Sequence, residues 1–216
     1  MKKILAAAIM VILMTPLSAQ AFDWSSLFRW LFFTTETTST KKDVSEYSSV
    51  ASDIRNSAKS VDKNVENVLL AIMPNLSVQK DAANFESRIN ALSNGNKTES
   101  QISTQLTQIV NDYATSLQNN KLVVIVTIKT LSDSDKKELS GNISSLSKYV
   151  QEYSELEQKA KKQATELQKY TTQSDEQTQV LNEINNVNTE MKNKANALQN
   201  LTTTLKLFGK LGGLEF

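Results

Sequence analysis

Nine apolar residues between Val44 and Ile72 recur at spacings that alternate between three and four without a break. This heptad rhythm places them on one narrow face of an α-helix, and such a face is buried only against other helices. The residues are Val44, Tyr47, Ala51, Ile54, Ala58, Val61, Val65, Val68 and Ile72. Several are Ala or Val, so a partner helix must approach closely. The pattern predicts one helix that begins near Thr40 and ends at Pro74.

Apolar stripes at helical spacing continue along the rest of the chain. Two shorter helices are predicted, from Val78 to Leu92 and from Thr98 to Leu117, and the Ser93–Asn96 cluster between them predicts an antiparallel pair. Two longer stripes predict helices that reach from Leu139 to Tyr170 and from Leu181 to Phe208. The chain therefore alternates helices with short connections.

Polar residues at the predicted helix ends have the spacing of capping motifs. Thr98 with Gln101, and Ser174 with Gln177, match the capping box, in which two side chains satisfy the free backbone donors of the first turn. A Ser132–Asp135 cluster predicts a third helix start. Three glycines from Gly209 onward predict the end of the last helix.

The run from Leu122 to Ile128 is apolar and β-branched, so its periodicity fits a helix or a strand equally well. A single strand would find no ladder partner elsewhere in this chain, and its backbone groups would lack hydrogen bonds. We therefore predict a helix that is buried in the bundle.

These patterns predict an all-α fold, an elongated antiparallel helical bundle or coiled-coil-like rod of about four to five helices. The chain has only 5 Gly and 2 Pro, which favours long helices with few turns. With no Cys, its stability depends on helix packing and not on disulfides. We assign residues 41–208 to the bundle and 209–216 to a flexible C-terminal tail.

The N-terminus has the pattern of a secretory signal peptide. Two lysines precede an apolar stretch from Ile4 to Met14, and Ala19-Gln20-Ala21 follows as a cleavage site. The apolar stretch is shorter than the ~20 residues that span a membrane. Residues 1–21 are therefore predicted to be removed on export to the periplasm or the medium.

Residues 22–40 combine an aromatic segment with a Thr-rich linker. The segment holds both tryptophans of the chain and has no helical stripe. Trp and Phe favour the lipid interface, so the segment is a candidate membrane or partner contact; covering the end of the bundle is the third option. The candidate contact residues are Phe22, Trp24, Leu27, Phe28, Trp30, Leu31, Phe32 and Phe33.

No catalytic, cofactor or metal site is predicted. The chain has no His and no Cys, which excludes His-dependent triads, thiol catalysis and His-ligated metals. Two carboxylate pairs at helical spacing, Asp62 with Glu66 and Glu152 with Glu155, lie among lysines and are predicted to be solvated. The net charge of +1, with both signs interleaved, gives no basic stripe for nucleic acid. An enzyme is not predicted.

The sequence thus favours an exported, non-enzymatic interaction or structural protein of the bacterial envelope or secreted fraction, with a protein partner or self-association through its helical stripes. The first alternative is a membrane-active protein that contacts the membrane surface. Its layout of long helices, a β-branched apolar insert and an aromatic segment loosely resembles that of α-helical pore-forming toxins of the cytolysin A type, although no motif is shared. The second alternative is a minor pilus or secretion-system subunit.

Overall fold

The computed structural model describes residues 44–76, 79–92, 96–169 and 174–216, and these form six α-helices preceded by a short 3-10 helix. The helices are η1 (Val44–Tyr47), α3 (Val50–Leu76), α4 (Gln79–Asn90), α5 (Glu99–Asn119), α6 (Lys121–Thr130), α7 (Asp133–Gln168) and α8 (Asp175–Gly212). Strands are absent from the described residues. The predicted all-α helical bundle is confirmed, with slightly more helices than the four to five expected because α5 and α6 are separated at Asn120.

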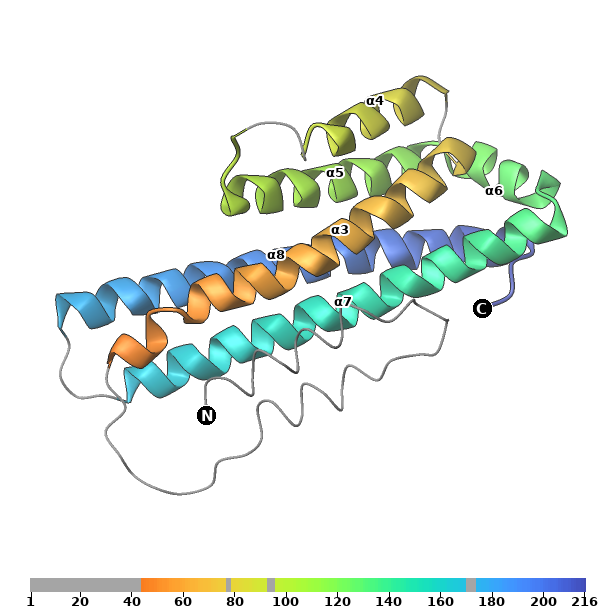
Figure 1. Ribbon diagram of the computed structural model, residues 1–216. Helices are drawn as coiled ribbons and strands as arrows, with labels where there is room; N and C mark the ends of the chain where they lie inside the picture. Colours follow the sequence, from red (N-terminus) through yellow and green to blue (C-terminus); the bar gives the residue numbers. More distant parts are fainter. Residues whose placement is uncertain (1–43, 77–78, 93–95, 170–173) are drawn as a thin grey trace, which may run out of the picture. The chain divides into compact units, whose positions relative to one another are not determined.

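The long helices α7 and α8 lie side by side and antiparallel, and α3 packs against both (Figure 1). Two hydrogen bonds mark the two ends of the α7 and α8 pair. Gln177 Nε2 donates to the Leu167 carbonyl over 2.9 Å, and Ser140 Oγ donates to the Glu215 carbonyl over 2.5 Å. The predicted stripes of all three helices point inward and are buried or partly buried, apart from Tyr170, which lies outside the described residues.

Helices α4 and α5 form an antiparallel pair that packs on α3 and α8 (Figure 1). The rings of Phe85 and Tyr113 meet edge to face with their centroids 5.3 Å apart. Arg88 pairs with Asp112 at 2.6 Å beside them. This pairing confirms the predicted antiparallel arrangement.

The helix starts agree with the predicted capping motifs in two cases and differ in detail in the third. Thr98 and Gln101 form the full capping box, and Ser132 caps α7. Ser174 caps α8 as predicted, but the Gln177 side chain donates to the α7 carbonyl of Leu167 and does not accept from the Ser174 backbone N–H. A tertiary hydrogen bond thus replaces half of the expected box.

Three predicted helix boundaries are wrong. The first helix is interrupted at Ser48 and Ser49, where the Ser48 hydroxyl donates to the Ser45 carbonyl and competes with the helical backbone. Helix α3 continues past Pro74 to Leu76, and α8 continues past Phe208 to Gly212, where Gly213 adopts a φ of 89° and caps it.

The run from Leu122 to Ile128 is helical, as predicted, but it is buried on one face only. Val124 and Ile128 are 1% and 0% exposed, whereas Leu122, Val123 and Val126 are 77%, 55% and 59% exposed. The expectation of a fully buried segment is therefore wrong. The cause is its position at one end of the bundle, where α6 contacts α8 and the ends of α3 and α5 while its outer face is left uncovered.

Candidate functional site

The described residues hold a buried polar cluster in the middle of the bundle, made by α3, α7 and α8. Lys194 Nζ lies 2.7 Å from both carboxylate oxygens of Asp62, and the Tyr153 hydroxyl donates to Asp62 Oδ1 over 2.5 Å. The Lys194 and Asp62 side chains are 3% and 11% exposed. Burial, and then the adjacent Asp62 carboxylate, raise the pKa of Tyr153 well above its usual value, so the phenol remains a neutral donor.

The two charged members of this cluster lie beside apolar stripes, and the third lies within one. Asp62 follows the stripe residue Val61, Lys194 precedes Ala195, and Tyr153 is itself a stripe residue of α7. The prediction that Asp62 and Glu66 are solvated is wrong, since both are buried. The neighbouring lysines of α3, Lys59 and Lys63, are exposed, but the two carboxylates lie on the side of the helix that other helices cover.

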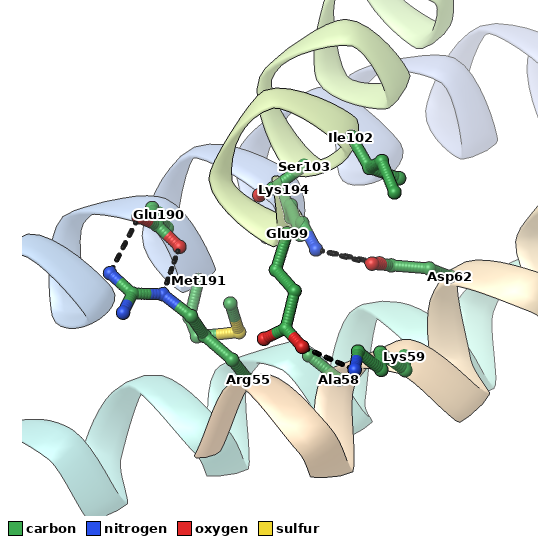
Figure 2. Close-up of a pocket in the computed structure, with 10 residues that line it drawn as sticks. All are labelled: Arg55, Ala58, Lys59, Asp62, Glu99, Ile102, Ser103, Glu190, Met191 and Lys194. Carbon is green, nitrogen blue, oxygen red and sulfur yellow. Dashed lines mark hydrogen bonds and ion pairs between the residues drawn. The ribbon is translucent and has the colours of Figure 1, made fainter. Parts of the chain in front are cut away.

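Ion pairs at the surface surround the cluster and join three helices (Figure 2). Arg55 of α3 donates to both carboxylate oxygens of Glu190 on α8, at 3.2 and 3.1 Å. The hydrogen bond with Glu190 raises the pKa of Arg55. Lys59 of α3 pairs with Glu99 of α5, which ties the α4 and α5 pair to the other helices.

The cavity between these residues has a volume of about 30 Å³, which leaves room for little more than water. Small-molecule sites usually have volumes of about 300–1,000 Å³. The Asp62 carboxylate is engaged by an ammonium and a phenol, so it is not poised to accept a proton from a substrate. The cluster is therefore a set of polar contacts that aligns α3, α7 and α8.

Neither a metal site nor a membrane span is found in the described part of the chain. Its His, Cys, Asp and Glu residues include no group of three that could hold a metal ion. None of its helices combines the length and the apolar composition needed to cross a bilayer.

A second candidate site is the outer surface of α6 together with the last turns of α8 and Phe216 after them, which we name the apolar end. All large hydrophobic side chains that are exposed in the described residues belong to it. They are Leu122, Val123, Val126, Leu207, Leu211 and Phe216. A concentration of exposed apolar side chains in one region usually marks a contact with a protein, a membrane or a ligand.

The sequence predicts that the run containing α6 is a helix, but it does not predict that this helix forms an exposed surface. The eight predicted contact residues between Phe22 and Phe33 lie outside the described residues. The signal that could have identified the apolar end is the pair of leucines at Leu207 and Leu211, which lie four residues apart and off the predicted stripe.

The fold and these two sites define a class of protein, a helical bundle with a polar interior cluster and one apolar end. Comparisons with protein-family models, curated proteins and solved structures found no match to this chain.

Proposed function

We propose that this chain is an exported, non-enzymatic interaction protein of the bacterial envelope or secreted fraction, and that its binding surface is the apolar end. The observation that carries the proposal is the concentration of exposed large hydrophobic side chains on α6 and the last turns of α8. Leaving such side chains in water has a free-energy cost, and a partner that covers them recovers it.

Two further observations support this function. The polar cluster around Asp62 and Lys194 encloses too little space for a substrate, which speaks against catalysis there. The signal-peptide pattern of residues 1–21 supports export. A membrane-active protein is the second candidate, and the exposed side chains of α6 favour it because a lipid surface can cover them as well as a protein can.

Site-specific photo-crosslinking in intact cells tests the proposal. A photoreactive amino acid replaces Val126 at the apolar end or, as the control, the exposed Lys161 on α7. We expect adducts in the envelope or culture fraction from position 126 and few from position 161. Equal yields at the two positions, or protein retained in the cytosol with its first 21 residues, would contradict the proposed function.

A further inference from the structure

This inference rests on the proposed function and specifies the partner of the same site. We propose that the apolar end is a docking surface for a bilayer that carries anionic lipid headgroups, and that α6 lies in the plane of the interface. The protein binds the bilayer peripherally. A helix of 10 residues is about 15 Å long, which is half the thickness of the hydrocarbon core.

The inner contacts of α6 determine how it is oriented. Val124 and Ile128 face inward, and Ile128 packs against the backbone of Gly212 on α8. A Cβ atom at Gly212 would lie 2.4 Å from Ile128 Cγ2, so glycine is what permits this close approach. With the inner face held in this way, Leu122 and Val126 are turned to solvent.

Lysines share the exposed faces with the apolar side chains. Leu122, Val126 and Lys129 follow the spacing i, i+4, i+7 and lie on one face of α6. On α8, Leu207 and Leu211 flank the exposed Lys210. Such a mixture of aliphatic side chains and lysines is typical of helices that lie at a lipid interface, where the long lysine side chains reach back to the headgroups.

The two segments that form the surface carry positive charge only. Residues 121–132 and 206–214 contain no Asp or Glu, and Lys121, Lys129, Lys206 and Lys210 stand beside the apolar side chains. The ends of α3 and α5 that contact α6 carry neutral residues such as Asn75 and Asn119, so they add no negative charge to the surface.

The carboxylates near this region include Asp133 and Asp135 in the first turn of α7, Asp81, which accepts a hydrogen bond from Ser116 near the end of α5, and Glu215, which adjoins Phe216. The two aspartates of α7 are placed at a helix N-terminus, where their charge interacts favourably with the helix dipole. Helix α6 and the last turns of α8, which carry the leucines and lysines, contain no carboxylate themselves. Their exposed faces are therefore complementary to anionic headgroups.

A protein partner or a second copy of the chain fits this surface less well. Lysine is depleted at protein interfaces, where aromatic residues and Arg dominate, and Phe216 is the single exposed aromatic residue among the six. A second copy would bring the same four lysines to face their counterparts, and like charges at an interface are unfavourable.

Vesicle binding of the purified protein tests the inference. The probes are vesicles of phosphatidylcholine alone and of phosphatidylcholine mixed with phosphatidylglycerol. We expect binding to the anionic vesicles that weakens as ionic strength is raised from about 0.05 to about 0.5 M, because the charges are exposed. The Lys121→Gln and Lys129→Gln double variant should lose about fivefold in affinity for each lysine. The matched control, Lys161→Gln with Lys192→Gln, removes two exposed lysines elsewhere and should bind as the parent does.

The apolar contribution is tested with Leu122→Ser and Val126→Ser together. Both side chains are exposed, so the variant should retain its helicity and melting temperature while losing at least about tenfold in vesicle affinity. A Trp reporter provides a direct readout: Trp24→Phe and Trp30→Phe remove both tryptophans of the chain, and Val126→Trp then adds a single one. Its emission should shift to the blue with anionic vesicles, whereas a Lys161→Trp control should not.

Four outcomes would overturn the inference. They are no vesicle binding, equal binding to both vesicle types, binding that the α6 substitutions leave unchanged, and a parent dimer that Leu122→Ser and Val126→Ser convert to a monomer. Crosslinking from position 126 to a protein, combined with absent vesicle binding, would retain the proposed function and refute the lipid partner.

Discussion

Replacing Asp62 with alanine is expected to lower the free energy of unfolding by about 3–5 kcal/mol, because it leaves a buried ammonium without its counter-charge. Lys194 is 3% exposed and has the Asp62 carboxylate within 2.7 Å. Tyr153 would lose its hydrogen-bond acceptor at the same time. Urea unfolding followed by circular dichroism measures the change.

An exposed ion pair provides the matched control for this prediction. The Lys59 and Glu99 side chains are 55% and 39% exposed, and Lys59→Ala should cost less than about 1 kcal/mol. The double variant Asp62→Leu with Lys194→Met removes both buried charges and should recover most of the loss. An Asp62→Ala variant as stable as the Lys59→Ala variant would show that the carboxylate is not paired in a buried site.

Replacing Gly212 with alanine is expected to lower the free energy of unfolding by about 1–3 kcal/mol through overpacking. The added methyl group would lie 2.4 Å from Ile128 Cγ2 and 2.7 Å from Ile128 Cβ, so α6 must shift away from α8. Urea unfolding measures the loss of stability. Faster amide exchange in residues 121–130 should accompany it, because this contact holds the inner face of α6.

Gly141 is the control for the glycine prediction because it also lies within a long helix. It is exposed on α7, and a Cβ atom there would meet nothing within 4 Å. Gly141→Ala should therefore raise stability by about 0.5–1 kcal/mol through helix propensity alone. Equal effects of the two substitutions would contradict the close packing of α6 on Gly212.

The sequence was sufficient to predict the bundle, because its information about helices is local. The stripes of α3, α7 and α8 repeat at a spacing that only a helix places on one face. The caps at Thr98, Ser132 and Ser174 depend on side chains within three residues of the backbone donors they satisfy. Both kinds of signal act over a few residues and do not depend on which helix packs against which.

The buried cluster could not be predicted because it depends on which helices meet. Asp62 and Lys194 are 132 positions apart, and each alone is a charged residue beside a stripe. Beside a stripe, a charged side chain is solvated unless a third helix covers it. Here α5 covers α3 and α8 at that level, and the two opposite charges are enclosed together.

The wrong prediction that α6 is fully buried has the same cause, because burial depends on which helices meet. Leu122 to Ile128 is apolar on every face, so its sequence cannot say which face is inside. Burial is decided by neighbours, and α6 is located at the end of the bundle where only one of its faces meets other helices. A run with Thr127 as its single polar position therefore predicted full burial, whereas the packing buries Val124 and Ile128 and exposes the opposite face.

Thiol labelling of single-cysteine variants tests the exposed apolar end most directly. The parent chain has no Cys, so only the introduced thiol can react. Val126→Cys and Val124→Cys place a thiol two residues apart on opposite faces of α6, at positions that are 59% and 1% exposed. We expect the folded protein to react with a maleimide rapidly at position 126 and slowly at position 124, with equal rates after unfolding in urea. Equal rates in the folded state, or slow reaction at both positions, would contradict an apolar surface that is open to a partner.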